Sequence, residues 1–154
     1  MKLIPMTEAY FRTYLQTALR LYAAEKVKAG NWREEDAEAN AKESYEQLLP
    51  DGVYSDGHYL YEAVVDGNTI GMIWFATQEN SKGFIYDVLI DEAFRGRGYG
   101  SLLLQEAERE ARRIGITVFG LHVFAHNKRA VQLYQSAGYE LTNIIMEKKL
   151  EGEE

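Results

Sequence analysis

The 154-residue sequence contains no cysteine, and this absence restricts its chemistry. Without a thiol there is no disulfide framework, no thiolate ligand for a metal ion and no cysteine nucleophile. The lack of cysteine also fits the cytoplasm, where we expect this protein to act, and we expect it to hold no metal ion.

Long apolar runs and an excess of positive charge are missing as well. No uninterrupted apolar segment approaches the ~18 residues that a bilayer span needs, and the N-terminus lacks the apolar region of a signal peptide. The formal net charge is −7, from 24 acidic and 17 basic side chains, whereas nucleic-acid binders normally carry a basic surface. We therefore predict a soluble protein that binds neither membranes nor nucleic acid.

The spacing of apolar residues predicts one α/β domain over residues 1–154, with elements in the order β-α-α-β-β-β-α-β-α-β. Strands are expected at residues 2–6, 58–65, 69–77, 84–90, 117–124 and 139–150. Helices are expected from Thr7 to about Gly30, from about Arg33 to the stop at Pro50, and over residues 98–114 and 128–137. We find no internal repeat, low-complexity segment or linker.

Two turn signals fix how the middle strands connect. Asp66-Gly67-Asn68 and Asn80-Ser81-Lys82-Gly83 join three consecutive strands, which predicts an antiparallel meander. Residues 117–124 are almost wholly apolar, which indicates burial on both faces, and they follow a helix, which predicts a parallel pair with the third meander strand. The expected fold is a mixed, mostly antiparallel sheet flanked by helices.

A glycine loop, Arg95-Gly96-Arg97-Gly98-Tyr99-Gly100, lies between the third meander strand and the next helix. Glycine lets the backbone turn tightly, and the first N–H groups of a helix favour anions, most often phosphate. The P-loop pattern is excluded because no Gly-Lys pair occurs, and the Gly-x-Gly-x-Gly spacing differs from the dinucleotide fingerprint. Taken alone, the loop also fits a flexible turn with solvated arginines.

A second motif follows at the next junction of strand and helix. Asn127 precedes the expected helix, and Tyr134 lies two turns later on the same helix face. The two motifs read Arg95-x-x-Gly98-x-Gly100 and Asn127-x-x-Ala130-x-x-Leu133-Tyr134-x-x-x-Gly138-Tyr139. Together they resemble the motifs of the GNAT superfamily of N-acetyltransferases, and the resemblance covers roughly residues 60–139.

The resemblance implies that acetyl-CoA is the acyl donor and that specific residues bind it. The main chain of one strand would pair with the pantetheine arm, and the loop N–H groups would bind the pyrophosphate. The implied residues are Val88, Leu89, Ile90, Arg95, Gly96, Arg97, Gly98, Tyr99, Gly100, Ser101, Asn127 and Tyr134. Two alternatives stay open, because Arg97 can be a solvated arginine and Asn127 can be a helix N-cap.

The resemblance also implies catalytic roles. Tyr134 would protonate the departing CoA thiolate, although its position also fits a core tyrosine. His122 is one candidate for the general base, with an intrinsic pKa near 6.5, but it also fits a strand histidine without a catalytic role. Glu62, Tyr86, Asp87 and a water chain are the other candidates.

The function implied is direct transfer of an acetyl group to a primary amine of a small molecule or peptide, since no acetyl-cysteine intermediate can form. The alternative is a non-catalytic acyl-CoA-binding sensor on the same fold. A homodimer stays open.

Overall fold

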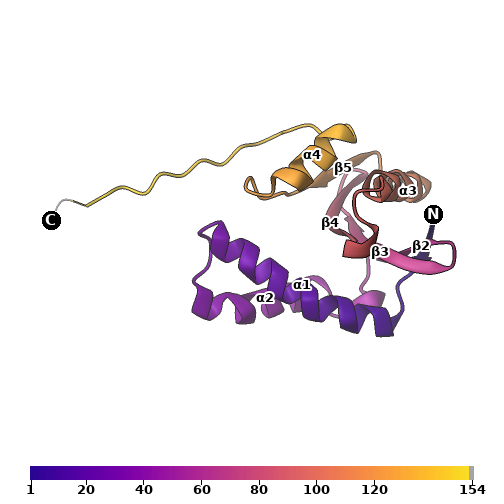
Figure 1. Cartoon of the computed structure of the whole chain (residues 1–154), viewed down its shortest axis with the longest axis horizontal. Coiled ribbons are helices and arrows are strands. Elements are labelled where there is room, and N and C mark those ends of the chain that lie inside the picture. The colour runs from indigo at the N-terminus through magenta and orange to yellow at the C-terminus, as the bar shows by residue number, and fades with distance from the viewer. Residues whose placement is uncertain (153–154) are drawn as a thin grey trace.

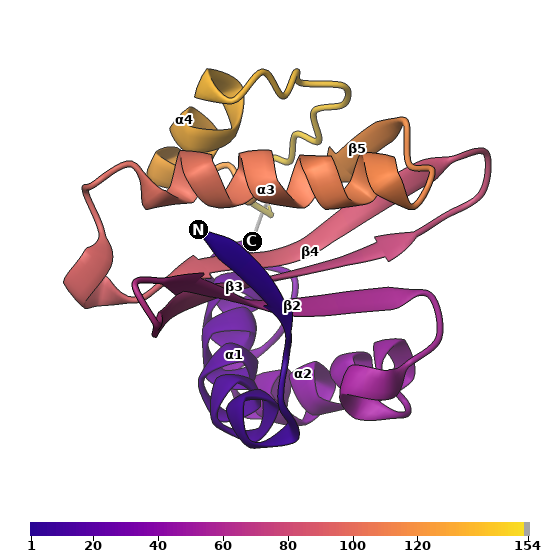
Figure 2. The same cartoon turned by 90° about the vertical axis from the view of Figure 1, so that its right-hand side faces the viewer.

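The computed structural model describes residues 1–152, in which a five-stranded sheet lies between two layers of helices (Figures 1 and 2). The strands are β1 (Lys2–Pro5), β2 (His58–Val65), β3 (Asn68–Thr77), β4 (Lys82–Ile90) and β5 (Val118–Leu121). The helices are α1 (Glu8–Lys28), α2 (Glu34–Leu48), α3 (Tyr99–Arg113) and α4 (Lys128–Ser136), with 3₁₀ turns at Gly52–Tyr54 and Glu92–Phe94.

The sheet order is β1-β2-β3-β4-β5, with three antiparallel pairs followed by one parallel pair between β4 and β5. The turns of the meander explain the antiparallel part. Asp66 and Gly67 have φ values of 50° and 79°, and Asn80 and Ser81 have φ values of 61° and 58°. Two consecutive residues with positive φ form the tight turn whose twist matches a β-hairpin, and Asn, Asp and Gly tolerate it best.

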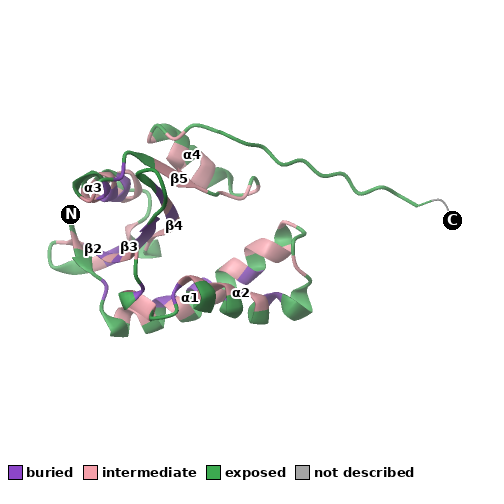
Figure 3. Ribbon diagram, turned by 180° about the vertical axis from the view of Figure 1, so that it is seen from behind, coloured by how far each residue is buried: buried purple, intermediate pink, exposed green. Residues whose placement is uncertain are grey.

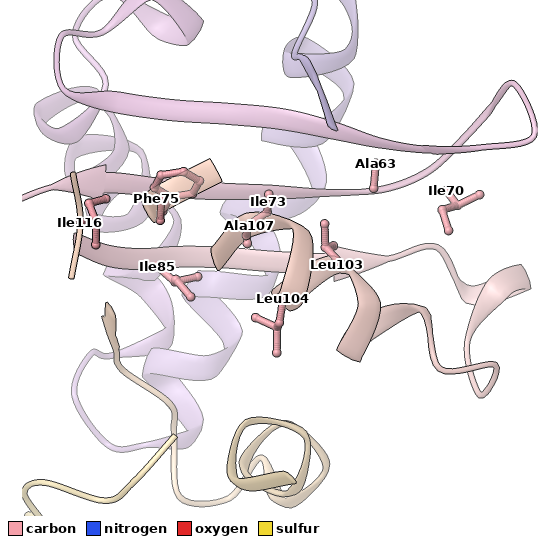
Figure 4. Close-up of a cluster of buried hydrophobic side chains, with 10 residues drawn as sticks. Ala63, Ile70, Ile73, Phe75, Ile85, Leu103, Leu104, Ala107 and Ile116 are labelled. Carbon is pink, nitrogen blue, oxygen red and sulfur yellow. The ribbon is translucent and has the colours of Figure 1, made fainter. Parts of the chain in front are cut away.

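The central strand β3 is buried on both faces, because helices cover both sides of the sheet (Figure 2). Ile73 and Phe75 pack with Leu103, Leu104 and other side chains in the cluster beneath α3 (Figure 4). Their neighbour Trp74 points the other way and packs with Tyr14 of α1. This alternation gives the sheet one apolar core on the side of α3 and α4 and another on the side of α1 and α2.

A β-bulge in β4 interrupts this alternation. Trp74 of β3 pairs with Asp87, whereas the next residue, Phe75, pairs with Ile85, so Tyr86 is the extra residue. Tyr86 packs in the cluster beneath α1, and Asp87 accepts a hydrogen bond from Tyr14 of α1. The bulge therefore directs two consecutive side chains toward the same helical layer.

The pairing of β4 with β5 is short. It covers only residues 82–85 of β4 and 118–121 of β5, after which the two strands separate. Residues 86–90 of β4 therefore have β3 on one side and no strand among residues 1–152 on the other.

The fold class is confirmed, but two expectations about the C-terminal part were wrong. The fifth strand is shorter than residues 117–124, lies at the sheet edge and is partly exposed instead of buried on both faces. Residues 139–150 form no strand within the described part of the chain. Tyr139 is half-buried, and the residues after it are exposed and extend away from the body (Figures 1 and 3). An apolar pattern predicts an extended conformation, but it does not supply the neighbouring strand that completes a sheet.

None of the helices within residues 1–152 combines the length and apolar character that a membrane span needs.

Replacing Leu103 with Ala tests the core beneath α3. Leu103 is fully buried, so the substitution should lower the free energy of unfolding by about 2–5 kcal/mol through lost burial and the cavity left behind. Leu21→Ala is the matched control, because Leu21 lies on α1 with 51% of its surface exposed. Urea denaturation of both variants checks the prediction, and equal losses would contradict the assigned core.

Candidate active site

A cavity of about 380 Å³ lies where β4 separates from β5. We call it the β4–α3 cavity, because the end of β4, the glycine loop, the start of α3 and the start of α4 form it. Its lining residues are Val88, Leu89, Ile90, Phe94, Arg95, Gly96, Gly98, Tyr99, Gly100, Ser101, Asn127, Arg129, Ala130 and Leu133. The structure thus brings together all the residues predicted to bind the donor except Arg97 and Tyr134.

The glycine loop leaves the start of α3 accessible. Gly98 is the N-cap residue in the left-handed conformation, with φ 82°, and no side chain within residues 1–152 caps the helix there. A Cβ atom at Gly96 or Gly98 would project into open space, with no heavy atom within 4 Å. The first N–H groups of a helix have no intrahelical partner and favour an anion. These features suit a phosphate group in the cavity.

Gly100 has a different role from the two loop glycines. A Cβ atom there would lie 3.3 Å from Leu133 Cδ2 of α4. Gly100 therefore lets α4 pack closely against the start of α3, which holds Asn127 and Ala130 at the cavity wall.

The arginines of the loop are used in different ways. Arg95 turns back along the chain, and its Nε donates a hydrogen bond to the backbone oxygen of Ile90 at 2.9 Å. Arg97 is exposed, with its guanidinium 5.6 Å from the centre of the Phe94 ring. Arg129 lines the cavity and was missed, because a basic residue in the first turn of a helix carries no signal of its own. Arg95 braces the loop, while Arg97 and Arg129 add positive charge beside it.

Asn127 is the N-cap residue of α4, which is one of the two interpretations that the sequence allowed. Its Oδ1 accepts a hydrogen bond from the backbone N–H of Ala130 at 3.2 Å, which starts α4. The same side chain lines the β4–α3 cavity, so capping and ligand contact are compatible.

Asp87 of β4 is linked to Tyr14 of α1 by a hydrogen bond and to Tyr134 of α4 by the effect of its charge. The Tyr14 hydroxyl donates to Asp87 Oδ2 at 2.6 Å, while Asp87 is half-buried on the bulged part of β4. Burial raises the pKa of the Asp87 carboxyl, and the hydrogen bond from Tyr14 opposes that rise. Burial and the charge of Asp87 raise the pKa of Tyr134 to about 12, so its hydroxyl keeps its proton across the neutral range.

The other candidates for the general base lie in distinct surroundings. His122 follows β5 and is largely exposed. The partial burial that remains lowers the pKa of its imidazole, and the charge of Lys26 adds to this effect. Glu62 is buried, and its two oxygens accept hydrogen bonds from the Thr7 backbone and the Thr69 hydroxyl, both at 3.0 Å. These contacts give Glu62 a structural role in tying the start of α1 to the sheet.

Tyr86 stacks on Trp74, with ring centres 4.6 Å apart. The sequence offers Tyr86 and Asp87 as candidates and does not choose between them. Strict alternation along a strand would place the two on opposite faces of the sheet. Only the bulge turns both toward α1, and only the hydrogen bond from Tyr14 distinguishes Asp87 from its neighbour.

A second contact joins the helical layer of α1 to the region of α4. His126, in the connection between β5 and α4, contacts a carboxylate oxygen of Glu25 of α1 through Nε2. Sequence analysis missed it, because the two residues are 101 positions apart and neither belongs to a motif.

Comparisons with known proteins agree with this geometry. The model of the acetyltransferase (GNAT) family matches residues 15–139. The uncharacterized N-acetyltransferase YycN of Bacillus subtilis is 38% identical over 152 residues, covering 96% of this chain and 97% of its own. The crystal structure of YycN superposes with a TM-score of 0.93 at 37% identity, covering 98% of this chain and 99% of that one.

A more distant structure shows the same fold. The PaiA N-acetyltransferase of Thermoplasma acidophilum, solved in complex with coenzyme A, has a TM-score of 0.70 at 22% identity and covers 94% of this chain and 92% of its own. The family match spans most of the chain, and YycN matches nearly all of it. With the glycine loop, the separated strands and the two motifs in place, the chain belongs to the acetyltransferase (GNAT) family.

Proposed function

We propose that this protein transfers the acetyl group of acetyl-CoA directly to a primary amine of a small molecule or a peptide. The observation that carries the proposal is the edge of β4 at residues 86–90, which has no partner strand within the described residues and meets the start of α3 in one cavity. An extended arm with a phosphate group at one end suits both features at once.

The donor would lie along β4. The amide-rich pantetheine arm would form main-chain hydrogen bonds with residues 88–90, as an added strand does. Its pyrophosphate would meet the N–H groups of residues 95–101, with Arg97 and Arg129 supplying positive charge. The cavity also offers the amide of Asn127 as a polar contact for the arm.

The reaction would take place beside Asp87 and Tyr134. The amine nitrogen attacks the thioester carbonyl carbon, a C–N bond forms, and the C–S bond breaks. A main-chain N–H of β4 would stabilise the negative charge on the carbonyl oxygen. Tyr134 would give its proton to the thiolate, for which a high pKa is suitable because the hydroxyl stays protonated until the leaving group develops charge.

The amine must lose a proton as it attacks, and we propose Asp87 as the acceptor. Its carboxylate is half-buried, it influences the pKa of Tyr134, and the Tyr14 hydrogen bond favours its charged form. A carboxylate at this point also favours an ammonium group, which supports a cationic amine as the acceptor. His122 and a water chain are the alternatives, and the pH experiment below distinguishes Asp87 from both of them.

Turnover can be measured without a signal from protein thiols. Because the chain has no cysteine, a thiol reagent detects only the CoA released from acetyl-CoA. We expect release above the rate of hydrolysis with at least one member of a panel of polyamines, amino sugars and peptides with free N-termini. Tight binding of acetyl-CoA without turnover on any amine would instead favour an acyl-CoA sensor.

Gly98→Ala tests the phosphate site. The substitution strains a residue with φ 82° and places a methyl group in the β4–α3 cavity, so the Kd for CoA should rise at least tenfold. Gly115→Ala is the matched control, because Gly115 ends the same helix with φ 97° and open space around its Cβ position. Calorimetric titration should find that the Kd of Gly115→Ala for CoA lies within twofold of that of the unaltered protein. An equal loss of CoA affinity in both variants would contradict the phosphate site.

Tyr134→Phe tests the proposed acid. Removal of the hydroxyl should lower kcat by about tenfold or more, on the usual scale for general acids, with little change in the Kd for acetyl-CoA. Tyr139→Phe is the control, because this neighbouring hydroxyl hydrogen-bonds Glu108 at 3.0 Å, away from β4. Steady-state kinetics with one acceptor check both variants, and an unchanged kcat in Tyr134→Phe removes Tyr134 from the mechanism.

Tyr14→Phe tests Asp87 as the base. The Tyr14 hydrogen bond lowers the pKa of Asp87, so its removal should raise that pKa and move the acidic limb of kcat/KM to higher pH. Asp87→Asn should lower kcat and abolish this limb. Tyr10→Phe, which removes another hydroxyl of α1, should leave the limb in place. A limb that does not move in Tyr14→Phe would favour His122 or water.

A further inference from the structure

Four aromatic side chains are in contact beside Asp87, on the side of the sheet that faces α1 and α2 (Figure 2); we call them the aromatic platform. They are His58 of β2, Trp74 of β3, and Phe84 and Tyr86 of β4. Tyr86 stacks on Trp74, with ring centres 4.6 Å apart and 19° between the planes. The ring centres of Phe84 and His58 lie 4.8 Å and 5.7 Å from that of Tyr86. Three strands therefore contribute to one connected aromatic surface.

The platform is partly open. Trp74 is only 1% exposed, whereas His58, Phe84 and Tyr86 are each partly exposed. Because one face of the Tyr86 ring is stacked on Trp74, the exposure of this ring comes from its other face and its edges. Phe84 lies beside Gly120 of β5, where a Cβ atom would be 3.9 Å from Phe84 Cδ2 but glycine has none. These rings therefore present an apolar surface that a ligand can contact.

The bulge in β4 joins the platform to the proposed reaction site. Tyr86 is the extra residue of the bulge, and it packs in the cluster beneath α1. The next residue, Asp87, is directed toward the same layer, where it accepts the hydrogen bond from Tyr14. An acceptor whose amine meets the carboxylate of Asp87 therefore has the ring of Tyr86 beside it.

The platform offers no partner for a second positive charge on the acceptor. Burial raises the pKa of Tyr86 and lowers that of His58, and no charged neighbour contributes to either change. His58 Nδ1 accepts a hydrogen bond from Trp74 Nε1 at 3.0 Å, so this nitrogen carries no proton and the imidazole is neutral. Covering an ammonium group without a carboxylate beside it costs far more free energy than covering an aromatic ring. An uncharged, apolar body therefore suits this surface.

Beyond the platform the ring contacts lead to a positive charge. They continue from Trp74 to Tyr45 and from Tyr45 to Tyr22, with ring centres 5.5 Å and 5.7 Å apart. Lys26 Nζ lies 5.7 Å from the centre of the Tyr22 ring. The neighbouring carboxylate, Glu25, is already in contact with a histidine. A polyamine that extended along these rings would bring an ammonium group toward the charge of Lys26, which disfavours it as the acceptor.

We propose that the acceptor is an arylalkylamine, a primary amine with one positive charge on a short alkyl chain that ends in an aromatic ring. This inference rests on the proposed function and names the acceptor of that acetyl transfer. The ammonium group pairs with Asp87 before it loses its proton, and the aromatic ring contacts the open side of Tyr86 and the ring of Phe84. Tyr86 is then a specificity-determining residue.

Three amines of similar size test the acceptor class in the assay of CoA release. They are phenethylamine, its saturated counterpart cyclohexylethylamine, and the diamine putrescine. The kcat/KM for phenethylamine should exceed that for cyclohexylethylamine by about twofold to tenfold, because only an aromatic ring gains from contact with other rings beyond the area that it buries. It should exceed that for putrescine by about tenfold or more, because the second ammonium group lacks a carboxylate. Equal use of the two ring amines, or a preference for putrescine, would overturn the inference.

Tyr86→Leu tests the platform itself. Loss of the ring should raise the KM for phenethylamine by about fivefold or more with little change in kcat, and Tyr86→Phe, which keeps the ring, should restore the original KM. Tyr59→Leu is the matched control. Tyr59 stacks on Phe75 with the same angle of 19° between the planes, but it packs in the cluster beneath α3. The Kd for CoA should stay within twofold in every variant, which shows that each is folded. Equal increases in KM in Tyr86→Leu and Tyr59→Leu would overturn the inference.

Calorimetric titration with phenethylamine at saturating CoA separates this inference from the proposed function. If no amine is acetylated, the proposed transfer fails, whereas phenethylamine binding that Tyr86→Leu weakens supports the platform on its own. If an amine is acetylated but phenethylamine does not bind, the platform is overturned and the proposed function stands. Absence of both acetylation and binding overturns both.

Discussion

The separation of β4 from β5 after Ile85 is the constraint on which the candidate site depends. Up to that residue the two strands share a parallel ladder, and beyond it the main chain of β4 has no partner strand on that side among residues 1–152. Main-chain N–H and C=O groups are strong hydrogen-bonding groups that need partners when covered. The glycine loop, the start of α3 and the start of α4 converge on this edge, and in our proposal an extended ligand with amide groups would supply these partners.

The bulge in β4 has the second decisive effect. It lets Asp87 reach Tyr14 of α1 while remaining close enough to affect the pKa of Tyr134 on α4. In a regular strand without the bulge, a carboxylate at the position of Asp87 would face only one helical layer. Here it connects the half of the molecule that would bind the donor with the half formed by α1 and α2. The contact between Glu25 of α1 and His126 adds a second connection between the layer of α1 and the start of α4.

Part of the positive charge is concentrated around the glycine loop, in the half of the molecule that would bind the donor. The chain carries a net charge of −7, yet arginines at positions 95, 97 and 129 surround the glycine loop. The first of these braces the loop through the carbonyl of Ile90, so the positive charge near the cavity comes mainly from the other two. On the side of the sheet covered by α1 and α2, the rings of Tyr22, Tyr45 and Trp74 are in contact one after another, with centres 5.7 Å and 5.5 Å apart.

The sequence by itself determined the meander, the four helices, the glycine loop and the helix start at Asn127, because turns, caps and periodicity are local properties. It also determined most of the cavity lining, since a strand end and two helix starts carry those residues in consecutive runs. The tertiary structure alone decided that Glu62 is structural, that Arg95 braces the loop and that Asp87 faces Tyr14. Residues 139–150 show most clearly where prediction from the sequence ends. Their pattern predicted an extended strand. Which edge such a strand pairs with depends on contacts between distant parts of the chain or between chains.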